Sequence, residues 1–111
     1  MRIRSVLQEF EAHLQPVQPG SKVRGKSEWK HYEDGTYRFK LSIVHIPLTD
    51  GTEIDLWRDG SWLMRIPVQG GKARLAMEND SGSGIPAIQA GQIVQVRHGE
   101  VILAEGRYET E

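Results

Sequence analysis

Apolar and polar residues alternate with a period of two along much of the chain, most clearly between Tyr37 and Ile43. In that run every second residue is apolar, and the residues between them are basic or hydroxylated. Such alternation places apolar side chains on one face of a β-strand and polar side chains on the other. Similar patterns predict strands at 9–15, 22–32, 72–78, 92–97 and 100–108, and two more strands within 51–68.

Near the N-terminus a second pattern competes with the strand pattern. An apolar stripe at helical spacing is formed by Ile3, Val6, Leu7, Phe10 and Leu14. We favour a strand at 9–15, because Phe10 and Leu14 also alternate with polar residues there and Pro16 ends the run. Residues 1–8 are interpreted as a lead-in segment, and the form of 2–8 stays open between helix and strand.

The segment 51–68 is predicted to be a β-hairpin that turns at Asp59-Gly60, since glycine adopts positive φ without steric cost. A two-residue loop would place Trp57 directly opposite Trp62. We favour a three-residue loop that includes Arg58, because it gathers most apolar side chains on one face. The inner face would then contain Ile54, Leu56, Trp62, Met64 and Ile66. The outer face would contain Asp55, Trp57, Ser61, Leu63 and Arg65.

The C-terminal third is predicted to contain a polar loop at 79–84, a short apolar plug at 85–88 and a last hairpin. Pro86 argues against a central strand in the plug. The last hairpin is predicted to turn at His98-Gly99, which sets Arg97 opposite Glu100. That register places four apolar residues on one face: Val94, Val96, Val101 and Leu103.

Seven or eight short strands with frequent glycine turns predict an all-β fold, an antiparallel β-sandwich or a small barrel. The length of 111 residues fits a single domain at 1–111. No segment shows the alternation of helices and strands that a parallel α/β sheet requires.

Composition excludes several function classes. The formal net charge is −1 with interspersed signs, so nucleic-acid binding is not expected. The basic residues Arg24, Lys26, Lys30, Arg38 and Lys40 are interleaved with acids such as Glu28 and Glu33, so a nucleic-acid patch there is only a weak third interpretation of the surface residues. The lack of cysteine excludes disulfides and thiolate chemistry. No apolar run is long enough for a membrane helix and no secretory apolar region is present, so membrane insertion is not expected and a cytoplasmic location is the default expectation.

The histidines and acids give no catalytic or metal-binding motif. None of the four histidines is paired with another at a metal-ligand spacing, and no cofactor is predicted. An enzyme that uses His45 or His98 with nearby acids is the least favoured hypothesis. Calcium binding by Asp50, Glu53, Asp55 and Asp59 lacks the required spacing, so solvated turn acids are the default interpretation.

Aromatic residues are the better indication of function. Trp57, Tyr32 and Tyr108 are candidates for exposed contact surfaces, whereas Trp29 and Trp62 are predicted to be core. For Trp57 a position in the core or packed on the sheet is the more ordinary interpretation, and exposure is the one that would indicate function. The favoured hypothesis is a non-catalytic interaction module whose binding residues are Trp57, Leu63 and Arg65, with a protein partner or a second copy as the ligand. The alternative is a carbohydrate-binding domain that uses exposed aromatic rings.

The order in which turn residues and apolar core residues follow one another resembles a known group of proteins over most of the chain from Phe10 onward. The matching stretches begin with Phe10-Glu-Ala-x-Leu14 and Gly25-Lys-Ser-Glu-Trp29, and they continue at 37–43, 51–56, 71–75, 85–96 and 101–108. This order is similar to small bacterial β-sandwich modules, which are often exported and of uncharacterised function. The resemblance implies a β-sandwich with a strand at 9–15, and it brings no functional residue with it.

Overall fold

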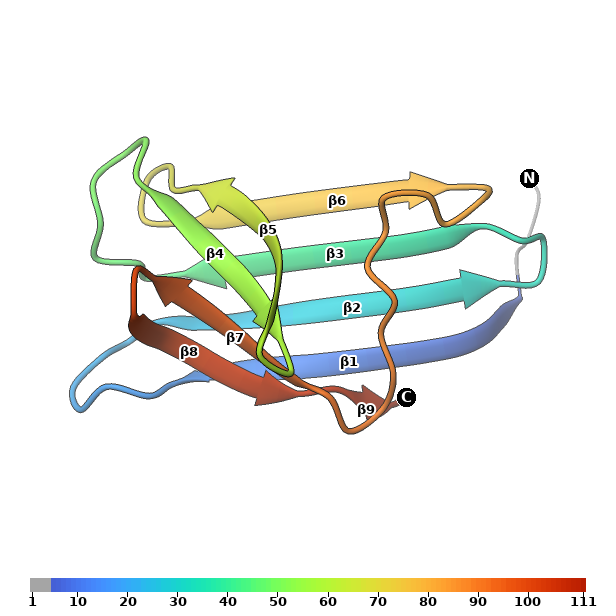
Figure 1. Ribbon diagram of the computed structural model, residues 1–111, viewed down its shortest axis with the longest axis horizontal. Coiled ribbons are helices and arrows are strands. Elements are labelled where there is room, and N and C mark those ends of the chain that lie inside the picture. The colour runs from blue at the N-terminus through green and yellow to red at the C-terminus, as the bar shows by residue number, and fades with distance from the viewer. Residues whose placement is uncertain (1–4) are drawn as a thin grey trace.

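The structure is a computed structural model that describes residues 5–111 (Figure 1). Every regular element in this range is a β-strand and every pair is antiparallel, which confirms the all-β fold. The strands are β1 (Val6–Pro16), β2 (Arg24–Tyr32), β3 (Tyr37–Val44), β4 (Glu53–Arg58), β5 (Ser61–Pro67), β6 (Ala73–Asn79), β7 (Ile93–His98), β8 (Val101–Arg107) and β9 (Glu109–Thr110).

One continuous sheet folds over itself into a nearly closed barrel. Its strand order is β5-β4-β7-β8-β1-β2-β3-β6, and β9 pairs with β1. In Figure 1 a first layer of β1, β2, β3, β6 and β9 lies behind a second layer of β4, β5, β7 and β8. β5 and β6 end the strand order without pairing, so the barrel has an open seam between them.

β1 joins the two layers. Most of β1 pairs with β2, whereas Gln15 and Pro16 at its end pair with β8. Gly106 of β8 makes this crossing possible. A Cβ atom at Gly106 would overlap the carbonyl oxygen of His13 and would lie 2.9 Å from the carbonyl carbon. The corner of the barrel therefore requires a residue without a side chain.

The core lies between the facing sides of the two layers. Of the four predicted inward residues of β3, Phe39, Leu41 and Ile43 are buried and Tyr37 is partly buried against the core. The second layer contributes Ile54, Leu56, Ile66, Val94 and Val96. Trp29 of β2 is buried, as predicted, and Val23, which precedes β2, is buried as well. The alternation along the strands therefore predicted most of the core correctly.

The central hairpin has a different register from the favoured prediction. Arg58 pairs with Ser61, so the loop contains Asp59 and Gly60 alone, and both have positive φ, 47° and 79°. Trp57 consequently lies opposite Trp62. The three-residue loop was wrong, and so was the core position of Trp62, which is 50% exposed.

A bulge next to the tryptophan pair then restores the predicted apolar face. The register shifts between Leu56 and Trp57, so Leu56 pairs with Met64 and Ile54 pairs with Ile66. A bulge inserts one extra residue on one strand and leaves the alternation intact on either side. The hairpin therefore combines the turn of one predicted register with the inner face of the other.

The last hairpin also departs from its predicted register. His98 pairs with Val101, which leaves Gly99 and Glu100 as the loop, and Arg97 pairs with Ile102 and not with Glu100. A register shift between Val96 and Arg97 follows. Val101 is accordingly 48% exposed, in contrast to the prediction, whereas Val94, Val96 and Leu103 are buried as predicted.

The remaining segments agree with the sequence patterns where the structure describes them. The strand predicted at 9–15 is confirmed, and it begins earlier, because Val6 to Gln8 continue β1. Ile3 lies outside the described residues. The segment 80–92 contains no strand and crosses the inner side of β3 and β2 (orange in Figure 1). Ile88 is buried there, as expected of an apolar plug.

Candidate functional site

The outer side of β4 and β5 carries two tryptophans held in fixed positions. Trp62 Nε1 donates a hydrogen bond of 2.9 Å to Asp55 Oδ1. Arg65 Nε donates to the same oxygen at 3.0 Å and forms an ion pair with it. One carboxylate therefore orients both an exposed indole and an exposed guanidinium group.

Trp57 is covered by an arginine from the neighbouring strand β7. The guanidinium carbon of Arg97 lies 4.5 Å from the centre of the Trp57 ring, within the range of a cation–π contact. Gln95 Oε1 accepts hydrogen bonds from Nε of Arg97, at 2.9 Å, and from its Nη2. Gln95 in turn donates to Glu105 Oε1 of β8 at 2.6 Å. These polar contacts extend the ordered surface across the second layer.

We call Asp55, Trp57, Trp62, Arg65 and Arg97 the tryptophan face. Burial alone would raise the pKa of Asp55, but the hydrogen bonds from Trp62 and Arg65 outweigh it and hold that pKa below its ordinary value. The hydrogen bond to Asp55 raises the pKa of Arg65. The face therefore keeps one fixed negative group between two cations at neutral pH.

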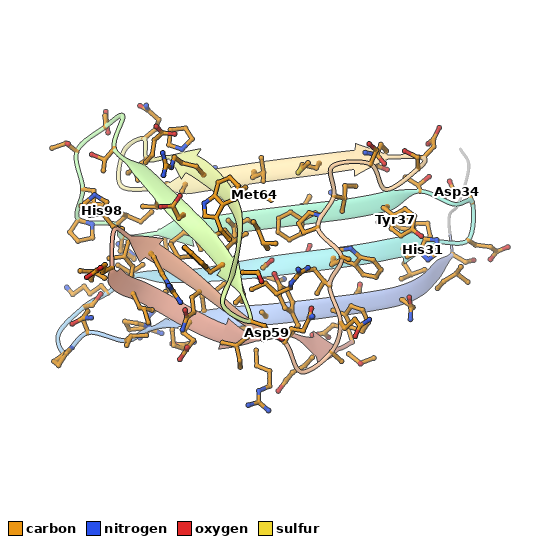
Figure 2. All side chains as sticks on the ribbon, viewed as in Figure 1. His31, Asp34, Tyr37, Asp59, Met64 and His98 are labelled. Atoms are coloured by element: carbon orange, nitrogen blue, oxygen red, sulfur yellow. The ribbon has the colours of Figure 1, made fainter. Side chains whose placement is uncertain are left out.

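The structure brings two of the three predicted binding residues onto this face. Trp57 and Arg65 lie on the outer side, although Arg97 and not Arg65 covers Trp57. Leu63 sits at the bulge, is partly buried against the core and does not join them. It lines a groove of about 310 Å³ between β5 and β6, together with Met64, Leu75 and Met77 (Met64 is labelled in Figure 2).

The sequence reasoning missed three residues of the tryptophan face. Trp62 would have been found from the two-residue loop, which puts it beside Trp57. Asp55 was assigned to the outer face and considered as a calcium ligand, but not as part of an aromatic binding surface. Arg97 comes from β7, which is adjacent to β4 only in the folded sheet, so no local pattern could indicate it. Tyr32 and Tyr108 were wrong as exposed surfaces, because they are 6% and 0% exposed.

The histidines offer no catalytic arrangement at the cavity that one of them lines. His45 is exposed, has a φ of 60° and borders a cavity of about 610 Å³ formed with 18–23, Ile46, Pro47 and Leu103. None of the residues described around this cavity is a carboxylate. His98 is exposed at the end of β7 (Figure 2). The imidazole–carboxylate pocket that the enzyme hypothesis requires is thus absent from this cavity.

The turn acids considered for calcium have structural partners. Asp50 Oδ1 accepts a hydrogen bond of 2.8 Å from the backbone of Gly70, and Asp59 Oδ1 accepts one of 2.7 Å from the backbone of Ile93. Within residues 5–111 no group of three or more metal-binding side chains is assembled. Asp50 and Asp59 therefore secure turns, whereas Asp55 orients Trp62 and Arg65.

The basic residues of β2 lie among acids on the outer side of the first layer. Lys26 Nζ lies 3.2 Å from Glu11 and 3.0 Å from Glu28, and Lys30 Nζ lies 3.2 Å from Glu9. The hydrogen bond between Lys26 and Glu28 raises the pKa of the lysine and lowers that of the glutamate. The charges of Lys26 and Lys30 are therefore largely balanced by neighbouring acids.

No protein-family model matches the chain, and no curated protein matches its sequence. In the part of the chain that the structure describes, no helix is long and apolar enough to cross a membrane. The tryptophan face itself is therefore the main basis for a functional proposal.

Proposed function

We propose that the protein is a non-catalytic interaction module that binds another protein chain through the tryptophan face, with a second copy of itself as the first partner to test. The observation that carries this proposal is the state of Trp62. Its ring is half exposed, yet its Nε1 atom is fixed by Asp55. Monomeric proteins seldom hold a large aromatic side chain rigid and exposed to water, whereas such side chains are typical anchors of protein interfaces.

The composition of the face supports a protein partner. Tryptophan and arginine are the residues most enriched among those that dominate binding energy at protein interfaces. Trp62 and Arg65 of β5 and Arg97 of β7 meet this description, and β4 lies between these two strands. Because Asp55 already orients Trp62 and Arg65, little side-chain entropy is lost when a partner binds.

A second copy is favoured because the face contains both signs of charge. In a two-fold dimer the same surface meets itself, so an acid on one copy can approach a base on the other. Asp55 and Arg65 supply such a pair within one face. The net charge of −1 gives little overall repulsion between copies.

Light scattering after size exclusion, over a range of protein concentrations, tests this proposal. We expect a dimer for the wild type, a monomer for Trp62→Ala and a dimer for the control Val101→Ala, which truncates an apolar side chain of similar exposure elsewhere on the second layer. Circular dichroism should show the same fold for all three. A monomeric wild type at every concentration, or equal dimerisation of the tryptophan variant, would overturn self-association.

Carbohydrate binding is a second candidate. The exposed indole of Trp62 is bordered by the carboxylate of Asp55, and Gln95 and Glu105 add polar groups farther across the same layer. A flat apolar surface beside polar groups is the combination that sugar rings need. Titration with neutral oligosaccharides should then shift the tryptophan fluorescence of the wild type and leave the tryptophan fluorescence of Trp62→Ala unchanged. An unchanged spectrum with every sugar would remove this candidate.

A further inference from the structure

A separate cavity lies on the inner side of the first layer, beneath the segment 80–92 that crosses it in Figure 1. Its volume is about 220 Å³. It is lined by Trp29, Tyr37, Ser81, Gly82, Ile85, Pro86 and Ala87. Two strands of the sheet therefore supply the aromatic side of the cavity, and the crossing segment supplies the opposite side.

The aromatic side belongs to a row of packed rings. Trp29 stacks on Phe10 with ring centres 5.3 Å apart, and Tyr37 lies tilted against Trp29 at 5.8 Å. Tyr37 also stacks on His31 at 4.1 Å, and Figure 2 shows these two side chains together at the end of β2 and β3. Rings held in this way present a flat apolar surface, which favours planar ligands.

Trp29 contributes an unused hydrogen-bond donor. The residue is only 6% exposed, and its Nε1 atom is buried without an acceptor among the described residues. Nearly all buried polar groups in folded proteins have a partner, because a buried donor loses its hydrogen bond to water and gains nothing in return. The Nε1 atom of Trp57 is also buried without an acceptor among the described residues, but Trp29 lines a cavity, where water or a ligand can accept its hydrogen bond.

The segment above the cavity is held by side chains at both ends. Asn79 accepts hydrogen bonds from the backbone of Ser81 and Gly82, and it donates to the carbonyl of Ser83 at 2.6 Å. Arg58 of β4 donates to the carbonyl of Ala87. These hydrogen bonds fix the segment along one side of the cavity, which is partly open to solvent.

We propose that this cavity binds a small neutral planar ring compound that carries one hydrogen-bond acceptor, with the acceptor placed on Trp29 Nε1. The ligand is neutral because none of the described residues that line the cavity is charged. A cavity of roughly 150 Å³ accommodates benzene. The additional volume here leaves room for a short substituent such as a carbonyl group. This inference is independent of the tryptophan face, which lies on the outer side of the second layer.

Two probes that differ in a single non-hydrogen atom test the proposal. Acetophenone has a ring and a carbonyl acceptor, and α-methylstyrene has the same shape with a methylene group in place of the oxygen. In ¹H–¹⁵N spectra of the full chain, the three indole N–H signals are assigned by single replacement of each tryptophan with phenylalanine. We expect acetophenone to shift the Trp29 signal downfield and saturably, and α-methylstyrene to bind at least tenfold more weakly without that shift.

Two variants separate the contributions of the donor and the space. Trp29→Phe should reduce the preference for acetophenone to less than twofold, because the donor is lost. Ile85→Trp fills the cavity from the crossing segment, outside the sheet, and should abolish binding even if Trp29→Phe does not fold. Equal affinity for the two probes, no saturable response of Trp29, or a response confined to Trp62 would overturn the proposal.

Discussion

Trp57 and Trp62 face each other across β4 and β5, one residue pair away from a two-residue turn and directly before a bulge. The turn sets this pair on the outer side of the second layer. The bulge then allows Ile54 and Ile66 to meet on the inner side. Without the extra residue, continued alternation from the tryptophan pair would place one strand out of phase with the core.

The turn at Asp59 should be sensitive to residue type. Its φ of 47° is tolerated by asparagine and aspartate and disfavoured for alanine, and its carboxylate also holds the backbone of Ile93. We expect Asp59→Ala to lower the free energy of unfolding by about 1–3 kcal/mol. Asp59→Asn keeps an acceptor oxygen and a residue type that tolerates this backbone conformation, so it should lower the free energy of unfolding clearly less. Urea denaturation measures the free energy of unfolding of both variants, and equal losses would contradict the dependence of the turn on this residue type.

The stability of the protein should depend on the ionisation of Asp55. The pKa of Asp55 is held below its ordinary value of 3.8, so the unfolded chain takes up this proton at a higher pH than the folded chain. The stabilisation is present above the unfolded pKa and is lost as the pH falls through the folded pKa. Asp55→Asn should remove this part of the acid dependence. Urea midpoints between pH 6 and pH 2.5 measure it, and parallel curves for wild type and variant would contradict the prediction.

The buried hydrogen bond between Ser27 Oγ and Tyr108 OH, 2.7 Å long, should contribute to stability as a pair. Tyr108→Phe leaves Ser27 without this partner and should lower the free energy of unfolding by about 1–3 kcal/mol. Adding Ser27→Ala should then lower the free energy of unfolding little further, because both polar groups are gone. Additive losses in a double-mutant cycle would show that the two hydroxyls do not depend on each other.

Tyr108 should also limit stability at alkaline pH. Burial raises the pKa of Tyr108 to about 12, while the unfolded chain loses this proton near the ordinary value of 10.0. The stabilisation is therefore complete below pH 10 and is lost as the pH rises toward the folded pKa. Between pH 9 and pH 11.5, wild type should lose more stability than Tyr108→Phe, measured by urea midpoints. A loss of the same size in both proteins would assign the alkaline effect to other groups.

Gly106 should tolerate no side chain. Alanine there would press its Cβ against the backbone of His13, which is fixed in β1 and cannot move aside. We expect Gly106→Ala to destabilise the protein by at least about 1–3 kcal/mol, the usual range for overpacking. Thr110→Ala, at an exposed position of β9, serves as the control and should be nearly neutral. A wild-type melting temperature for the glycine variant would show that β8 does not need this close crossing.

The sequence by itself determined the strands and most of the core. Alternation along 37–43 and 72–78 placed the correct side chains inward, since the period of a strand is fixed by its backbone. Asp59-Gly60 located the central turn for an equally local reason. The same local rules correctly separated the segment 85–88 from the strands, because Pro86 cannot take part in a central ladder.

Only the tertiary structure decided the registers and the composition of the tryptophan face. A bulge adds one residue without any signature in the hydrophobic pattern, so Trp62 and Val101 were assigned to the wrong side. Arg97 reaches Trp57 because β7 pairs with β4, and the cavity at Trp29 exists because 80–92 crosses distant strands. Alternation along a strand specifies the face of the sheet toward which each side chain points. The neighbours of that side chain on other strands depend on strand pairing, which is set by how the whole chain buries its apolar residues.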